Sequence, residues 1–217
     1  MTAPLHVYGS ALRRADAGRS AVLTLVSPRG QVVSQVDAAQ WTLRLRPGDE
    51  SMLGRCRGAT LDVGCGPGRL AAALHRRGRP ALGVDISVEA VRQAHRRGAL
   101  AMRGDVFAPL PMEGRWRSIL LADGNIGIGG DPGRLLRRCA GLLDRRGGVV
   151  AEVHPPGVPS WTGQVALHDG VRRSALFPWA RVAARDVNDL VGRTPLRVSD
   201  EWTEAGRWFV HLVQRRG

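Results

Sequence analysis

Residues 60–70, TLDVGCGPGRL, combine an apolar run, one acid and three glycines at alternate positions. Asp62 lies within the apolar run, and Gly64, Gly66 and Gly68 follow it. Glycine lets a backbone turn sharply and approach a ligand closely, and a loop that opens a helix favours an anionic group. The spacing is G-x-G-x-G, which differs from the G-x-G-x-x-G fingerprint of dinucleotide-binding folds. The stretch therefore predicts a ligand-binding loop between a strand and a helix.

Two further acids stand at the ends of the next two predicted strands. Asp85 stands in GVDIS and Asp105 in RGDVF. A carboxylate at the first position can accept two hydrogen bonds from a ribose diol. At the second it can accept from an adenine amino group while Val106 flanks the ring. Three successive strand ends thus predict a site for an adenosine with a short zwitterionic tail.

The segments LDVGCGPGRL, GVDIS, RGDVF and LLDRRGGVVAEV, in this order and spacing, resemble class I S-adenosylmethionine-dependent methyltransferases of the small-molecule type. The resemblance covers residues 59–154 closely. It implies a seven-stranded sheet with an antiparallel last strand, and S-adenosylmethionine as cofactor with S-adenosylhomocysteine as product. It places the methionine portion at the glycine loop, the ribose at Asp85 and the adenine near Asp105. The cofactor contacts implied are Asp62, Gly64, Cys65, Gly66, Gly68, Asp85, Ile86, Asp105, Val106 and Ala122.

The reacting end of such a site needs groups that orient or deprotonate the acceptor. The loop LADGNIGIGGDP places Asp123 and Asn125 after the fourth predicted strand, and His154 ends the fifth. We take these three as candidate catalytic residues, with a mere turn-positioning role for His154 equally open. The loop resembles the GN loop of small-molecule methyltransferases and lacks the N/D-P-P-Y/F pattern of enzymes that methylate base or glutamine amino groups. His6 and Tyr8 lie in a segment that can form a lid, although packing is the simpler role for Tyr8.

The elements that position these residues alternate between strand and helix after residue 59. This alternation is typical of a doubly wound, mostly parallel sheet with helices on both faces. An N-terminal β-hairpin and a short helix precede it, and a closing hairpin follows it. The expected strands are 20–26, 31–36, 59–64, 81–86, 99–106, 117–123, 149–155, 196–202 and 207–213, with 41–46 as a strand or a link. The expected helices are 46–56, 68–78, 87–98, 131–148 and 179–192.

We divide the chain into an N-terminal extension, residues 1–58, which can act as a lid, and a methyltransferase domain, residues 59–217. A substrate-side insertion is expected near 155–180, and with the extension it should build the acceptor pocket. Three cysteines without a C-x-x-C pair argue against a disulfide framework or a metal site and fit a reducing cytoplasm. No apolar run is long enough to span a membrane, and the first residues lack a signal-peptide pattern. The oligomeric state is expected to be monomer or homodimer.

The net charge of +13 raises the question of a nucleic-acid partner. All 32 Lys-or-Arg positions are arginine, which indicates a GC-rich, bacterial coding bias before it indicates a partner. Residues 51–150 hold 17 arginines and eight acids, and the arginines cluster towards helix C-termini. Cations are favoured there, at the sheet edge opposite the cofactor, so nucleic acid is not the expected partner.

These observations predict a methyltransferase acting on O, N or C of a small metabolite, in keeping with bacterial secondary metabolism. The alternatives are an RNA methyltransferase, a non-catalytic protein that binds S-adenosylmethionine on the same fold and, remotely, a dehydrogenase.

Overall fold

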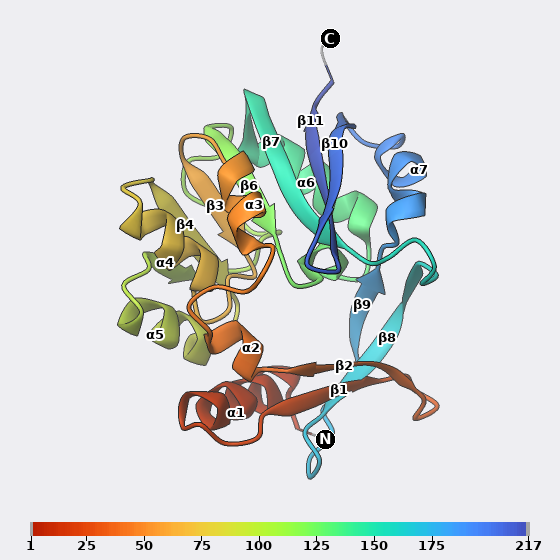
Figure 1. The fold of residues 1–217 in the computed structure, drawn as a ribbon. Helices are drawn as coiled ribbons and strands as arrows, with labels where there is room; N and C mark the ends of the chain where they lie inside the picture. Colours follow the sequence, from red (N-terminus) through yellow and green to blue (C-terminus); the bar gives the residue numbers. More distant parts are fainter. Residues whose placement is uncertain (1, 216–217) are drawn as a thin grey trace.

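The computed structural model describes residues 2–215 and contains two sheets. The larger has seven strands in the order β10-β11-β7-β6-β3-β4-β5 (Figure 1). Its strands are β3 (Thr60–Val63), β4 (Ala81–Asp85), β5 (Ala101–Arg103), β6 (Trp116–Leu121), β7 (Leu143–Val153), β10 (Leu196–Glu204) and β11 (Arg207–Gln214). The first five are parallel to one another, and β11 pairs antiparallel with both β7 and β10. The predicted doubly wound sheet with an antiparallel final strand is confirmed.

Helices cover both faces of this sheet because its central strands are apolar on both sides. Leu120 and Val150 join the core beneath α3 and α4, whereas Ile119 and Val149 join the core on the α6 side. Successive residues of a strand face opposite sides, so each strand contributes to both cores. The helices of this region are α3 (Asp49–Arg55), α4 (Arg69–Arg76), α5 (Val88–Arg96), α6 (Pro132–Leu142) and α7 (Val187–Val191).

Local capping agrees with the sequence at two helix starts. The Ser87 side chain accepts a hydrogen bond from the backbone N–H of Ala90, and the Asp131 side chain accepts one from Arg134. Each satisfies a backbone donor that the first turn of a helix leaves free.

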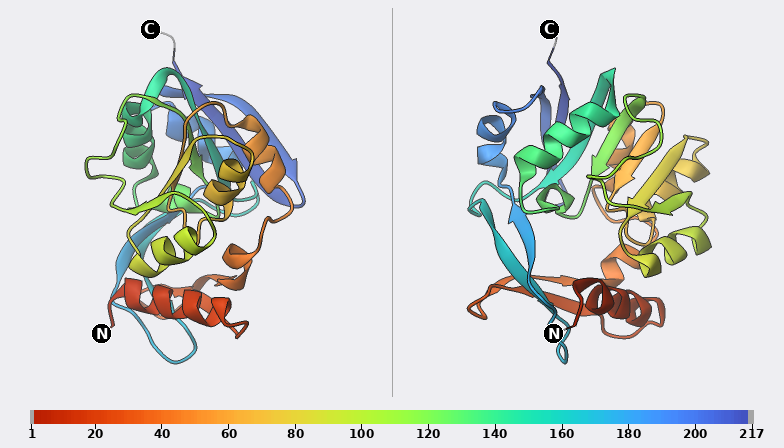
Figure 2. Two further views of the ribbon diagram at one scale, coloured as in Figure 1. Left: turned by 90° about the vertical axis from the view of Figure 1, so that its left-hand side faces the viewer. Right: turned by 180° about the vertical axis from the view of Figure 1, so that it is seen from behind.

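The second sheet has four strands in the order β2-β1-β8-β9. It is built from β1 (Val22–Val26), β2 (Val32–Asp37), β8 (Trp161–His168) and β9 (Phe177–Arg181). The predicted hairpin over residues 20–36 is therefore present, and its strand β1 pairs antiparallel with β8 from the segment after β7. Helices α1 (Pro4–Asp16) and α2 (Ala39–Thr42) complete this layer. Figures 1 and 2 show this layer lying across the edge of the main sheet where the parallel strands end.

Several predicted elements differ in the structure. The helix expected over residues 131–148 ends at Leu142, because residues 143–148 pair with β6 as the start of β7 instead of continuing to the glycines. The helix expected over 179–192 is divided: its first part is strand β9, a 3₁₀ turn spans Ala184–Asp186, and only Val187–Val191 is α-helical. Residues 41–46 form a link that begins in α2. Across the described residues, no helix is long and apolar enough to cross a lipid bilayer.

Candidate functional site

The glycine loop after β3 is shaped by contacts with three other segments. Gly64, Gly66 and Gly68 have φ angles of 68°, 53° and 79°, which disfavour other residue types. A Cβ on Gly64 would lie 2.8 Å from Asn125 Nδ2, and one on Gly68 would lie 2.7 Å from the Ala94 Cβ of α5. The two outer glycines therefore allow close packing, whereas only the Tyr8 hydroxyl, at 3.2 Å, lies near the Cβ position of Gly66.

Asp62 is a buried carboxyl beneath this loop. It is 2 % exposed, and its Oδ2 accepts a hydrogen bond from the Ala71 backbone N–H of α4 at 3.2 Å. Burial raises its pKa to about 7, and the Ala71 hydrogen bond opposes that rise only in part. The carboxyl therefore titrates near neutral pH, at a position where the cofactor's charged tail is expected.

Asp85 connects the end of β4 with the glycine loop. Its Oδ2 accepts from Gly66 N–H at 2.9 Å and its Oδ1 from Ser87 N–H at 2.8 Å. Burial raises its pKa, and the two backbone donors partly offset that effect. A carboxylate has about four lone-pair sites, so one on each oxygen remains for a vicinal diol. Beside it, the Cys65 thiol is buried against Gly83, and Ile86 is 48 % exposed.

Asp105 follows β5, the edge strand. Its side chain is exposed, and its Oδ1 accepts from Phe107 N–H at 2.9 Å, whereas Val106 is buried. Because β3, β4 and β5 are parallel neighbours, Asp62, Asp85 and Asp105 share one edge of the sheet. The residues present fit an adenosyl group. Asp85 is a buried acid that binds the glycine loop and keeps free acceptor sites, and Asp105 is an exposed acid beside the next strand.

The carboxylate of Asp123 belongs to a network of ion pairs that sequence reasoning did not find. Its Oδ1 lies 2.5 Å from Arg46, and its Oδ2 lies 2.5 Å from Arg69. We call the whole set the charge network; its members are Arg46, Asp49, Arg69, Asp123, Glu152 and Arg207. They come from separate segments, so no spacing in the sequence indicates the cluster.

The charge network is balanced and largely buried. Asp49 binds both Arg69 and Arg207, and its side chain is fully buried. Glu152 accepts from Arg207 at 2.7 Å and from the Asp123 backbone N–H at 2.7 Å. Burial alone would raise the pKa of Glu152, but the hydrogen bonds from Arg207 hold it below its ordinary value. The charges of its three cations and three anions cancel, and Asp123 within this network has a φ of 53°.

Asn125 and Ala122 stabilise the loop after β6. Asn125 Nδ2 donates to the backbone oxygens of Val63 and Gly64, both at 2.9 Å, and its own N–H donates to Ala122. The amide thus ties this loop to the glycine loop. Ala122 itself is buried.

His154 directly follows β7 at the same edge of the sheet. Its backbone is fixed by hydrogen bonds with Val182 and Ala184, and the imidazole is half-buried. Burial, and then the nearby Arg181 cation, lower its pKa, so the imidazole is neutral at pH 7. No hydrogen bond joins His154 to Asp123 or Asn125 within the described residues, so the three candidates do not form one contiguous group.

The second sheet packs directly on the loop after β6. Ile128 forms a β-bridge with Trp179, and a Cβ on Gly127 would overlap the Ala180 carbonyl. Two aromatic pairs also lie in the core of the second layer: Tyr8 with Trp41, at 5.7 Å between ring centroids, and Phe177 with Trp179, at 6.2 Å. Sequence reasoning noted Tyr8 individually but had no signal for these contacts. No cluster of three metal-binding side chains occurs in the part of the chain that the structure describes.

Comparison with known proteins agrees with this geometry. Residues 60–147 match the family described as "Methyltransferase domain". No curated protein sequence matches the chain significantly. A SAM-dependent methyltransferase from Bacteroides fragilis, solved with S-adenosyl-L-homocysteine, is similar in fold with a TM-score of 0.79 and 18% identity, covering 99% of this chain and 97% of that one.

Two further structures match the larger part of the chain. The CcbJ methyltransferase from Streptomyces caelestis has a TM-score of 0.57 and 15% identity, covering 77% of this chain and 87% of its own. The magnesium protoporphyrin IX methyltransferase from Synechocystis PCC 6803 has a TM-score of 0.57 and 16% identity, covering 77% and 82%. Residues 60–147 thus match a methyltransferase-domain family, and the chain as a whole has the sheet topology and fold of class I methyltransferases.

Proposed function

We propose that this protein transfers a methyl group from S-adenosylmethionine to a small-molecule acceptor. The cofactor supplies an activated methyl group on a sulfonium. Asp62 and the glycine loop, with Cys65, hold its methionine portion. Asp85 and Ile86 hold the ribose, and Asp105, Val106 and Ala122 border the adenine and the reacting end.

The main support for a small acceptor is that the second sheet covers the edge of the main sheet where we place the cofactor. The N-terminal extension (residues 1–58) and the insertion near 155–180 join in one sheet through β1 and β8. Its strand β9 contacts the loop after β6 through the Ile128–Trp179 bridge. We take the extension and the insertion as the walls of the acceptor pocket, with the pairs Tyr8–Trp41 and Phe177–Trp179 supplying aromatic surface. A cofactor edge covered by a second layer suits a small metabolite better than a folded polynucleotide.

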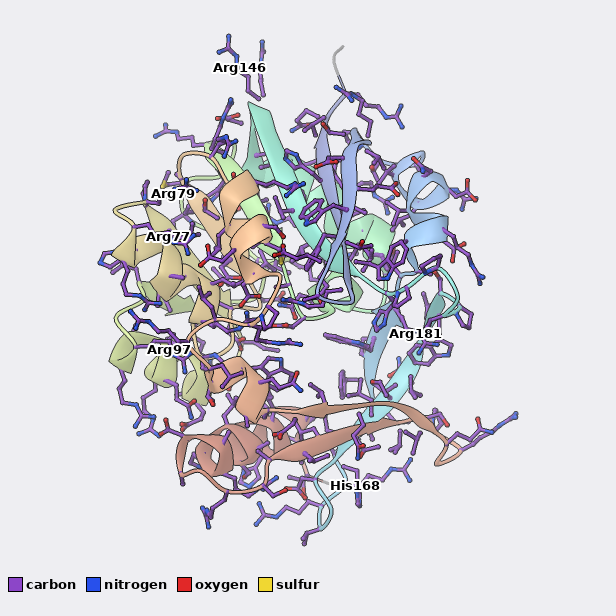
Figure 3. The ribbon with its side chains drawn as sticks, in the orientation of Figure 1. Arg77, Arg79, Arg97, Arg146, His168 and Arg181 are labelled. Atoms are coloured by element: carbon purple, nitrogen blue, oxygen red, sulfur yellow. The ribbon has the colours of Figure 1, made fainter. Side chains whose placement is uncertain are left out.

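The charge distribution supports the same proposal. Among the labelled arginines, Arg146 and Arg79 lie in the half of the molecule away from the second sheet, whereas Arg97 and Arg181 lie close to it (Figure 3). Arg97 is occupied there, because its guanidinium donates to the backbone oxygens of residues 41–43. At the site itself, the charge network pairs three cations with three anions. A nucleic-acid enzyme instead needs unpaired cations around its active-site mouth.

Among the three candidate catalytic residues, the contacts favour different roles. Both carboxylate oxygens of Asp123 already bind guanidinium groups, and Asn125 donates to the glycine loop. These two therefore orient the loops at the reacting end. His154 is neutral at pH 7 and makes no side-chain hydrogen bond within the described residues, so it is the candidate to take a proton from the acceptor.

The test is methyl transfer from tritiated S-adenosylmethionine to phenols, amines and carboxylic acids, and in parallel to bulk RNA across a salt series. We expect turnover on a small acceptor with little salt dependence, and its loss in Asp85→Asn. Methylation of RNA that falls steeply with salt would refute the small-molecule assignment. Cofactor binding without turnover on any acceptor would indicate the non-catalytic alternative.

A further inference from the structure

Tyr8, the only tyrosine of the chain, is carried by α1 to the glycine loop. Its hydroxyl lies 3.2 Å from the Cβ position of Gly66, the glycine of the loop that faces no other group within 4 Å. Its ring packs edge-on against Trp41, which fixes its direction. The side chain therefore covers the part of the loop that close packing leaves open.

The surroundings of the Tyr8 hydroxyl are those of the proposed cofactor site. Burial raises the pKa of this phenol well above its ordinary value, and the charges of Asp85, Cys65 and Asp123 raise it further. These three groups come from the end of β4, the glycine loop and the loop after β6. The phenol stays protonated at neutral pH and can donate a hydrogen bond among several acceptors.

Helix α1 reaches this position by lying on α5. Gly9 allows the close approach, because its Cβ position lies 3.4 Å from the Glu89 Cβ of α5. Few polar contacts hold the two helices together: Arg13 reaches Glu89 at 3.5 Å, and Arg96 pairs with Asp16 at 2.8 Å between exposed side chains. Exposed pairs of this kind contribute about 0–1 kcal/mol each, so the contact between the helices depends mainly on the packing of Val7 and Ala11 in one apolar cluster with Ala90 of α5.

We propose that Tyr8 is a positioning residue for the cofactor, delivered by α1 to the glycine loop, and that the cofactor exchanges only when α1 separates from α5. This inference rests on the proposed function, since it assigns a further contact to the same site. It predicts two separable effects: Tyr8 sets how tightly the cofactor binds, and the α1–α5 contact sets how fast it leaves.

Calorimetry with S-adenosylmethionine and S-adenosylhomocysteine tests the first effect. We expect Tyr8→Phe to weaken binding ~3–10-fold through loss of one hydrogen bond, and Tyr8→Ala to weaken it more than ten-fold. The matched control is Leu5→Ala, on the exposed side of the same helix, which should leave the affinity unchanged. The thermal midpoint without cofactor should be similar in Tyr8→Phe and the wild type. Equal affinities in all four proteins would overturn the assignment of Tyr8.

A reversible cross-link tests the second effect. The Gly9→Cys/Glu89→Cys double variant places two thiols close to the Cβ separation of a disulfide, about 3.5–4.5 Å. The native cysteines are buried, and burial raises the pKa of the Cys65 thiol, so they should oxidise slowly. Release of tritiated S-adenosylmethionine into excess S-adenosylhomocysteine should be at least ten-fold slower in the oxidised form. Reductant should restore it, which makes the reduced protein its own control.

The outcomes distinguish this inference from the proposed function. Oxidised protein that exchanges cofactor at the reduced rate would contradict the role of α1 while leaving the methyltransferase proposal intact. A wild-type protein that binds neither compound would instead contradict the proposed function itself.

Discussion

Replacing Asp62 by asparagine removes a buried ionisable group while keeping an oxygen that can accept the Ala71 N–H. The pKa of Asp62 is about 7 in the folded protein and 3.8 in its reference state, because burial disfavours the carboxylate. The folded protein therefore holds this proton more tightly than the unfolded chain. The stabilisation by protonated Asp62 is fully present below pH 4 and is lost as pH rises to about 7.

The magnitude follows from the two pKa values. Between pH 5 and pH 8 the wild type should lose about 2.5 kcal/mol of unfolding free energy through this one group. Asp62→Asn has no carboxyl proton to release, so its unfolding free energy does not fall in this way. The unfolding free energy of the variant minus that of the wild type should therefore increase by the same amount over that range. An unpaired amide N–H in the variant would cost about 1–3 kcal/mol, but at every pH, so the slope carries the test.

The assay is urea unfolding followed by far-UV circular dichroism at pH 5, 6, 7 and 8. Taking the difference between two proteins cancels the titration of all other groups. Asp189→Asn, the same chemical change on an exposed side chain without a hydrogen-bond partner in the described structure, is the control for the substitution itself. A pH-independent difference for Asp62→Asn would refute the reasoning, since it would mean that burial does not shift this carboxyl.

Three further predictions concern the site and its support. Asp85→Asn should weaken S-adenosylmethionine binding ten-fold or more by calorimetry, because the ribose contacts and the Gly66 hydrogen bond depend on this one carboxylate. Each hydrogen bond to a charged group contributes about 1.5–3 kcal/mol. Unchanged affinity would remove the residue from this role. His154→Gln should lower kcat/KM by about 10²–10⁴. Because the pKa of His154 lies below its ordinary value, wild-type activity should rise to a plateau by pH 7, and that acidic limb should vanish in the variant. Gly127→Ala should destabilise the fold by at least ~1–3 kcal/mol, because the added Cβ would overlap the Ala180 carbonyl. Gly141→Ala, in open space on α6, should instead stabilise the fold by about 0.4–1 kcal/mol. Equal unfolding midpoints for these two variants would contradict the packing argument.

The sequence by itself determined the main sheet and the cofactor edge. Apolar strands alternate with capped helices after residue 59, and that period follows from local geometry. Asp62, Asp85 and Asp105 each lie at or within two residues of the end of a strand, and parallel strands bring such ends to one edge. Local sequence patterns predicted the wrong secondary structure where pairing with a distant strand determined it. Residues 143–148 continue a helical pattern, yet pairing with β6 draws them into β7. Trp179 opens a helical pattern, yet pairing with β8 makes it part of β9.

Only the tertiary structure decided what surrounds the reacting end. The charge network joins residues as far apart as Arg46 and Arg207, and no spacing in the chain encodes their meeting. The same holds for Tyr8, whose helix reaches the glycine loop across α5. The physical reason is that a carboxylate's role depends on its partners: by its place in the sequence Asp123 is a candidate catalytic residue, but in the structure both of its oxygens are already bound by guanidinium groups. Those partners come from distant segments, so folding alone assigns them.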